Sequence, residues 1–122
     1  MANNTSGYVY VLSNPSFVKN ILKIGRTQSL SDRIKSLSNT SVPFDYELKL
    51  YLKVPIAKYK LAEKQIHDLL KGYQVSKEFY NCPISEVRKK FEQVAKLCGG
   101  KVYQYVKGDK DKQIYPPIKR KP

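Results

Sequence analysis

The stretch from residue 44 to residue 54 alternates apolar and polar side chains, and it is the clearest strand in the sequence. Apolar side chains occupy positions 44, 46, 48, 50, 52 and 54, whereas Asp45, Glu47, Lys49 and Lys53 fall between them. Successive side chains of a strand point to opposite faces, so the pattern predicts one buried face and one solvated face. This arrangement is typical of an antiparallel sheet that is packed on one side only.

Two shorter strands are predicted before it. Residues 7–13 are rich in Tyr and Val, and residues 21–25 form a second apolar run. The segment Asn14-Pro15-Ser16 between them has the composition of a turn. Together they predict an antiparallel hairpin at the start of the chain.

Three amphipathic helices are predicted from apolar side chains that recur every three or four residues. The first helix carries Arg33 in its first turn, and the third ends at Gly99-Gly100. The apolar positions are Leu30, Ile34 and Leu37 in the first helix, Tyr59, Ala62, Ile66, Leu69 and Tyr73 in the second, and Ile84, Val87, Phe91, Val94 and Cys98 in the third.

A short extended segment at 77–82 and a last strand at 101–106 complete the predicted elements. The order is strand, strand, helix, strand, helix, followed by one further helix. We therefore predict an α+β fold in which a small antiparallel sheet with a three-stranded core is flanked by helices.

The charge of the chain indicates its partner. There are 23 Lys and Arg residues against 10 Asp and Glu residues, which gives a formal net charge of +13. Nucleic acid is the polyanion that such a surface most commonly meets, although a generic basic surface is the alternative. The length of 122 residues favours one domain.

The cysteines and the N-terminus bear on the compartment. Cys82 and Cys98 are too few and too far apart for a zinc site, so we expect reduced, buried thiols and a cytoplasmic location, or the host-cell cytoplasm for a viral protein. Residues 1–6 are polar and do not form a signal peptide, and no apolar run approaches the roughly 20 residues of a membrane span.

The two N-terminal strands and the helix after them resemble the signature of the GIY-YIG nuclease superfamily. The tyrosine of its first motif is similar to Tyr10 in Gly7-Tyr8-Val9-Tyr10, and the second motif is similar to Lys23-Ile24-Gly25, where lysine replaces tyrosine. The arginine of its next helix is similar to Arg33. The resemblance implies a three-stranded antiparallel sheet with helices around it and an active site on the sheet face.

Further motifs resemble a phage and large-virus branch of this superfamily. That branch has Lys-Ile-Gly-Arg-Thr at the second motif, a helical Glu-x-x-x-His, here Glu63 and His67, and a later Glu-Phe-aromatic, here Glu78-Phe79-Tyr80. The resemblance covers about residues 7–82. It makes 1–106 the predicted nuclease-like domain, with this motif-bearing core and an extra helix at about 84–98, and leaves 107–122 as a basic flexible tail.

The resemblance implies a metal-dependent phosphodiester hydrolysis. Glu63 would bind one Mg²⁺ or Mn²⁺, because a hard cation takes oxygen ligands and keeps several waters. Arg33 would donate a fork of hydrogen bonds to the phosphate, and His67 would orient Glu63 or touch phosphate. Each has a plainer interpretation. Glu63 would pair with Lys60 or His67, Arg33 would pair with Asp32 or Glu47, and His67 would be a structural side chain of its helix.

Tyr10 and Lys23 allow several roles. Tyr10 would hold or deprotonate the attacking water, and Lys23 on the neighbouring strand would lower the pKa of the phenol by its charge. Alternatively Lys23 is itself the base or a phosphate clamp, or Tyr10 is a packing residue and Lys23 a solvated one. Glu78 and Asn81 are weaker candidates, Asn81 for the asparagine that follows the glutamate helix in the classical families.

Other cations are predicted to contact the nucleic-acid backbone. Arg26 and Thr27 fall in the loop beside the proposed site. The remaining candidates are Lys35, Lys89, Lys90, Lys119, Arg120 and Lys121. They would bind phosphates without reading sequence, so any specificity would come from a partner protein or from structure in the nucleic acid.

The favoured hypothesis is therefore a metal-dependent endonuclease, with DNA as the expected substrate and no expected membrane contact. One alternative is a nucleic-acid-binding protein that keeps the fold and lacks useful catalysis, because the second tyrosine is missing. A weaker alternative is an interaction module whose basic surface docks an acidic protein.

Overall fold

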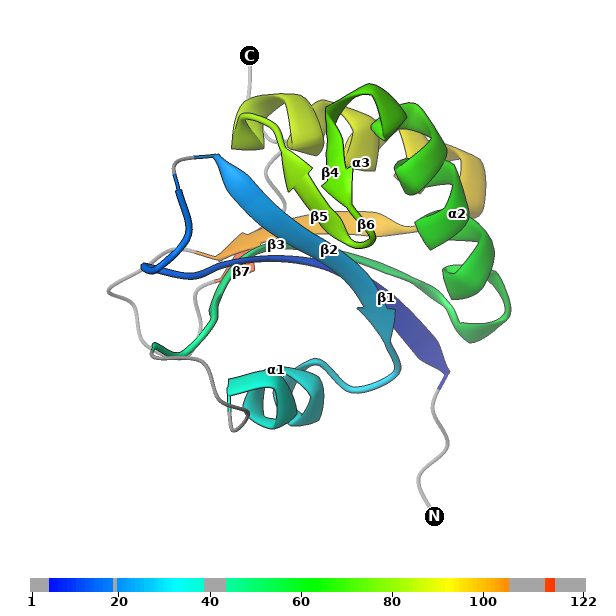
Figure 1. The fold of residues 1–122 in the computed structure, drawn as a ribbon. Helices are drawn as coiled ribbons and strands as arrows, with labels where there is room; N and C mark the ends of the chain where they lie inside the picture. The colour runs from blue at the N-terminus through cyan, green and yellow to red at the C-terminus, as the bar shows by residue number, and fades with distance from the viewer. Residues whose placement is uncertain (1–4, 19, 39–43, 106–113, 116–122) are drawn as a thin grey trace.

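A computed structural model describes residues 5–18, 20–38, 44–105 and 114–115 of the chain. It is an α+β structure, as predicted (Figure 1). The strands are β1 (Ser6–Ser13), β2 (Ile21–Thr27), β3 (Glu47–Pro55), β4 (Gln74–Ser76), β5 (Phe79–Asn81), β6 (Lys101–Tyr105) and β7 (Ile114–Tyr115), and the helices are α1 (Leu30–Ser38), α2 (Tyr59–Leu69) and α3 (Ile84–Cys98).

The sheet is larger than the predicted three-stranded core. Within the described residues it has seven strands in the order β4-β5-β2-β1-β3-β6-β7, and every neighbouring pair is antiparallel. The predicted hairpin of β1 and β2 lies at its centre, with β3 on the other side of β1. The predicted extended segment at 77–82 forms part of the β4–β5 hairpin, with Lys77 between the two strands at a φ of 48°.

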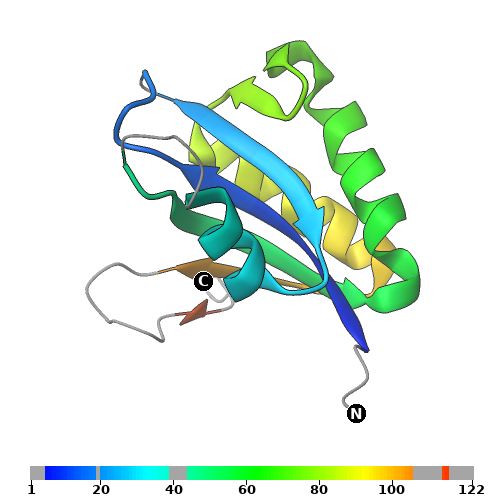
Figure 2. The ribbon, with the colours of Figure 1, turned by 60° about the horizontal axis from the view of Figure 1, so that its bottom comes forward.

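The helices cover the two faces of the sheet unequally. In Figure 1, α2 and α3 lie on one side of the sheet and α1 on the other, and Figure 2 shows α1 in front of the strands. The face under α2 and α3, called the core face below, carries the main apolar cluster, which includes Val9, Ile24, Leu52 and Phe91. We call the opposite side of the sheet the α1 face.

Three of the predicted boundaries are wrong. The second strand runs to Thr27 and not to Gly25. The third strand begins at Glu47 and not at Phe44, whose side chain is 53% exposed. The Phe44 carbonyl instead accepts a hydrogen bond of 2.7 Å from the Asn14 side chain, which holds it outside the strand ladder. From Leu50 to Val54 the predicted alternation is confirmed.

The second helix ends four residues earlier than its apolar pattern predicts. It stops at Leu69, and a 3₁₀ turn follows over Lys71–Tyr73. This turn moves Leu70 into the core and leaves Leu69 and Tyr73 37% and 38% exposed. The third helix has the predicted bounds, because Gly99 adopts the left-handed conformation with a φ of 73° and ends it.

Cys82 and Cys98 are buried free thiols, as predicted, and burial raises the pKa of Cys82 to about 11. None of the helices in the described part of the chain has the length and apolar content needed to span a lipid bilayer. Of the predicted tail at 107–122, only Ile114–Tyr115 is described, paired with β6. The rest of the tail lies outside the described residues.

Candidate active site

The alternation of β1 and β2 separates the packing side chains from the polar ones. Val9 and Ile24 belong to the core, so Tyr10 and Lys23, which occupy adjacent positions, point to the α1 face. Tyr10 lies directly opposite Gly25 in the strand pairing. A Cβ atom on Gly25 would lie 2.5 Å from the Tyr10 hydroxyl, so glycine leaves the space that the phenol occupies.

Glu78 enters the same space from the segment before β5. Its Oε1 accepts a hydrogen bond of 2.7 Å from Lys23 Nζ, and it would lie 3.1 Å from a Cβ on Gly25. The backbone holds it there, because Ile24 N–H donates to the Glu78 carbonyl at 2.8 Å. Lys23 Nζ also lies 5.1 Å from the centre of the Phe79 ring, so its stem packs against an aromatic side chain.

Arg33 approaches Tyr10 from α1. Its Nε donates to the Tyr10 hydroxyl at 3.3 Å, so its partner is neither Asp32 nor Glu47, the two plainer partners considered from the sequence. The pKa of Tyr10 is raised, chiefly by burial, with the hydrogen bond and charge of Arg33 acting in the opposite direction and Glu78 and Glu63 adding to the rise. The prediction that Lys23 lowers this pKa is therefore wrong, because the Lys23 charge is engaged by Glu78.

A second group of polar side chains lies where α2 passes the end of β2. Glu63 is 6% exposed, and its Oε1 lies 2.5 Å from Arg26 Nη1. His67, one turn later on α2, has its Nε2 3.7 Å from Glu63 Oε2. The same Nε2 lies 3.1 Å from the Ile24 carbonyl, which can only accept, so this nitrogen carries the proton and donates.

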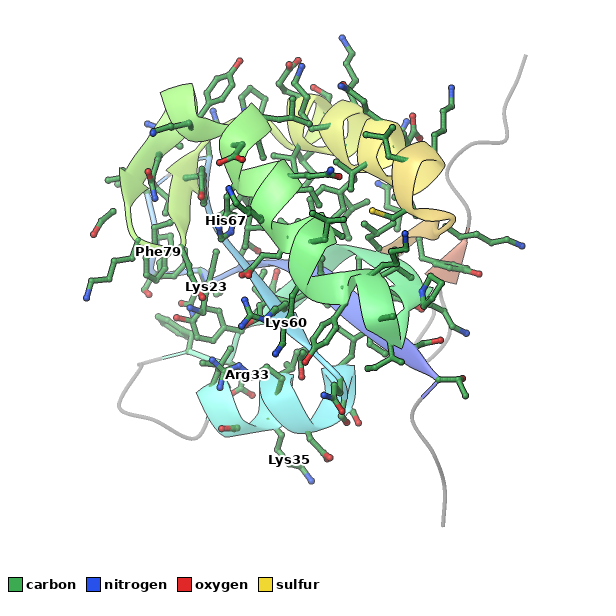
Figure 3. The ribbon with its side chains drawn as sticks, turned by 90° about the vertical axis from the view of Figure 1, so that its right-hand side faces the viewer. Lys23, Arg33, Lys35, Lys60, His67 and Phe79 are labelled. Carbon is green, nitrogen blue, oxygen red and sulfur yellow. The ribbon has the colours of Figure 1, made fainter. Side chains whose placement is uncertain are left out.

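The two groups meet at β2 from its two faces. Arg26 lies opposite the core residue Val9 and reaches Glu63 under α2, whereas Tyr10 and Lys23 point to the α1 face. Glu63 and Glu78 both act electrostatically on the Tyr10 phenol, although one stands on α2 and the other beside β5. Figure 3 shows Lys23, Arg33 and His67 on the same side of the molecule, with Lys60 of α2 between α2 and α1. The site thus combines two carboxylates, several cations and one phenol around the end of β2.

Comparison of the sequence with known proteins identifies the family of the chain. The T5orf172 domain matches residues 7–95, which is most of the chain. The chain belongs to the T5orf172 domain family. T5orf172 is a phage-type domain related to nuclease families.

A viral relative of this T5orf172 chain is the protein named "Uncharacterized protein 460R" of Invertebrate iridescent virus 6. It is 27% identical over 84 residues, a region that covers 68% of this chain and 38% of the viral protein. The chain therefore matches well under half of that relative. No solved structure matches the chain.

The matched T5orf172 region contains every residue of the site, and the sequence motifs identified most of them. The structure brings Arg33 to Tyr10, Lys23 to Glu78 and His67 to Glu63. Among the weaker candidates, Glu78 lies at the centre of the site. Asn81 is exposed at the far end of β5, paired with Ile21.

The predicted phosphate-contacting residues divide into three sets. Arg26 and Thr27 belong to the end of β2 and not to the predicted loop. Arg26 pairs with Glu63, and the Thr27 hydroxyl bonds the Ser29 backbone. Lys35 lies on α1 and points away from the other labelled side chains of Figure 3. The third set is Lys89 and Lys90 on α3, which approach Glu86 at 4.0 and 3.4 Å, and Lys119, Arg120 and Lys121, which lie outside the described residues.

Sequence reasoning missed one residue of the site. The sequence identifies Gly25 only as a motif position, because its role depends on the strand register that puts it under Tyr10. Lys60, the predicted ion-pair partner of Glu63, is exposed on α2, and Glu63 pairs with Arg26 instead.

Proposed function

We propose that this T5orf172 chain is a GIY-YIG-type endonuclease that hydrolyses nucleic-acid phosphodiester bonds, with DNA as its substrate and Mg²⁺ or Mn²⁺ as its cofactor. The observation that carries the proposal is the meeting of Tyr10, Arg33 and Glu78 in the space above Gly25. These side chains come from three separate elements, and a purely structural role requires neither a buried phenol at a glycine nor a carboxylate beside it.

The residues present fit a hard divalent cation. Glu63 offers a nearly buried carboxylate, and Mg²⁺ is commonly held by one or two carboxylates together with water and substrate phosphates. Among the described residues no three His, Cys, Asp or Glu side chains gather as a protein-only cage. When bound, the metal would polarise the phosphate and stabilise the charge on the leaving oxygen.

Arg26 and Arg33 supply the cationic side of the site. Arg26 is 44% exposed at its side chain and holds Glu63 Oε1, so it can turn from the carboxylate to a phosphate when substrate arrives. Arg33 Nε donates a hydrogen bond to the Tyr10 hydroxyl, and its two terminal nitrogens would donate to phosphate oxygens. Preorganised donors of this kind stabilise the charge that develops as the phosphorus–oxygen bond breaks.

Tyr10 and Glu78 divide the handling of the attacking water. Because its pKa is raised, Tyr10 is protonated at neutral pH and is a poor base, so it positions the water by hydrogen bonding. The Glu78 carboxylate faces the same space and accepts the proton as the water oxygen bonds to phosphorus. Lys23 fixes Glu78 in place through its 2.7 Å ion pair.

A second function has one observation in its favour. Both carboxylates of the site are paired with cations, Glu78 with Lys23 and Glu63 with Arg26. A carboxylate that is held in an ion pair is a weaker base. The same arrangement therefore fits a protein that binds nucleic acid and does not cut it. Supercoiled-plasmid nicking with and without Mg²⁺ separates the two functions.

We expect Mg²⁺-dependent nicking by the native chain and its loss in Glu63→Gln, which keeps the shape and removes the charge. Glu92→Gln, on α3 away from the site, is the matched control and should nick like the native chain. Native protein that binds plasmid and never nicks it would establish the second function. Undiminished nicking by Glu63→Gln would move the metal site elsewhere.

A further inference from the structure

The α1 face carries a row of tyrosines that leads away from the candidate active site. Tyr10 on β1 lies opposite Tyr51 on β3, and Tyr51 lies opposite Tyr103 on β6. The rings of Tyr51 and Tyr103 are stacked, with centres 5.2 Å apart and planes 20° apart. Tyr8 meets Tyr51 edge to face at 5.7 Å.

The row remains partly open to solvent. Tyr8, Tyr51 and Tyr103 are intermediate in exposure, unlike Tyr10, which is buried. Aromatic side chains on a sheet surface are a common platform for unpaired nucleic-acid bases, since every base has a flat face.

Two lysines stand beside the end of this row. Lys53 and Lys101 are direct cross-strand partners on β3 and β6, two positions from Tyr51 and Tyr103, so they share the α1 face. Like charges directly opposite each other destabilise a sheet. Neither lysine has an ion-pair partner among the described residues. An anion between them would remove the repulsion.

A pocket lies at the same place. Its volume is about 340 Å³, within the range of small-ligand sites, and its lining includes Lys53, Lys101, Tyr103 and the hydroxyl-bearing Thr5 and Ser6. Gly100 forms part of its wall and packs closely on β3, because a Cβ there would lie 2.5 Å from the Lys53 carbonyl. The pocket thus offers two cations, an aromatic ring and hydroxyl groups, which are the groups that recognise a phosphate and a base.

We infer that this pocket holds one unpaired nucleotide of the substrate strand, a few nucleotides from the bond that is cut, with its phosphate between Lys53 and Lys101 and its base against Tyr103. The inference rests on the proposed function for the presence of nucleic acid. Adjacent strands are about 4.8 Å apart, so Tyr103 lies about 10 Å across the sheet from Tyr10, a span that a few nucleotides cover. The inference predicts that the preferred substrate has a single-stranded segment beside the cleavage site.

The test is fluorescence anisotropy in EDTA at low salt, with a labelled single-stranded DNA of about ten nucleotides and a blunt duplex as probes. Lys53→Gln and Lys101→Gln should weaken single-strand binding more than Lys71→Gln, an exposed lysine of the 3₁₀ turn after α2 that controls for net charge. Lys53→Gln and Lys101→Gln should each also flatten the slope of log affinity against log salt concentration by about 0.7.

Tyr103 gives the sharper readout. Tyr103→Leu should weaken single-strand binding at least about fivefold and leave duplex binding unchanged, whereas Tyr103→Phe should bind both probes like the native chain. Tyr103→Phe also keeps the ring stack with Tyr51, so it remains informative if the leucine variant does not fold. Loss of binding in Tyr103→Phe would assign the effect to the hydroxyl and overturn the stacking inference.

Failure of this inference differs from failure of the proposed function. If all three substitutions at Lys53, Lys101 and Tyr103 bind like Lys71→Gln while the native chain still binds and nicks DNA, the pocket has no nucleotide and the proposed function stands. If the native chain binds neither probe, the proposed function fails and the inference fails with it.

Discussion

The two faces of the sheet are built from alternate residues of the same strands, and they are unlike in chemistry. On the core face Val9, Ile24 and Leu52 are fully buried among other apolar side chains. On the α1 face their neighbours Tyr10 and Lys23 hydrogen-bond to Arg33 and Glu78. The comparison teaches that alternate residues of one strand can serve apolar packing and polar contacts, so substitutions one residue apart should have different consequences.

The largest expected effect is a loss of stability on substitution in the core face. Phe91→Ala removes a fully buried ring of α3 and should cost about 3–5 kcal/mol of unfolding free energy, because a cavity is left behind. Tyr10→Phe on the α1 face keeps the ring and loses one hydrogen bond, so it should cost about 1 kcal/mol while abolishing nicking. Urea unfolding followed by circular dichroism measures both. Equal costs for the two variants would mean that the α1 face contributes to stability as much as the core face does.

A second prediction tests the shared space above Gly25. Gly25→Ala puts a methyl group 2.5 Å from the Tyr10 hydroxyl oxygen and 2.7 Å from the ring carbon that bears it, so the phenol must move from its place beside Glu78. Such overpacking typically costs about 1–3 kcal/mol, and we expect nicking to be lost. Gly72→Ala is the matched control, because nothing lies within 4 Å of its added Cβ. Nicking that survives in Gly25→Ala would show that Tyr10 and Glu78 need not share that space.

The smallest expected effect is a change in the pKa of one of two tyrosines, one on each face of the sheet. The pKa values of Tyr51 and Tyr80 are both raised to about 12, first by burial. The next cause is neighbouring tyrosines for Tyr51 on the α1 face, and the carboxylates Glu63, Glu78 and Asp68 for Tyr80 on the core face. Glu63→Gln should therefore lower the titration midpoint of Tyr80 and leave Tyr51 unchanged.

Ultraviolet titration of the phenols checks this, with Tyr51→Phe and Tyr80→Phe used to assign the late phases. Both pKa values lie above the ordinary value of about 10, so the folded state binds these protons more tightly than the unfolded chain. The stability that they contribute is fully present below about pH 10 and is lost as the pH rises toward 12. A Tyr51 midpoint that moves with Glu63→Gln would contradict the assignment of its shift to burial and the neighbouring tyrosines.

Much of the fold follows from local patterns, because periodicity and turn chemistry report on neighbouring residues. The alternation from Leu50 to Val54, the third helix and its glycine stop are all confirmed. The end of α2 was mispredicted because Leu69 and Leu70 fit a helical stripe almost equally, and the 3₁₀ turn that selects Leu70 depends on packing.

The candidate site was predictable as a set of residues and not as a set of contacts. The motifs identify Tyr10, Arg33 and Glu63, yet no pattern in the sequence pairs Lys23 with Glu78, which lies 55 residues further along the chain. That pair exists because β5 adds to the edge of β2, and β5 is only three residues long. Its brevity hid both the sheet extension and the central place of Glu78.

The positions of the site residues along the chain determine the order in which they are synthesised. Tyr10 and Lys23 are synthesised early, in the central hairpin, whereas Glu63 and Glu78 follow on α2 and beside β5. A growing polypeptide therefore holds a phenol and a lysine with no carboxylate to complete them until the chain beyond Asn81 can fold back on β2. Under the proposed function, the site is therefore incomplete until the last of its carboxylates has been synthesised and β5 has paired with β2.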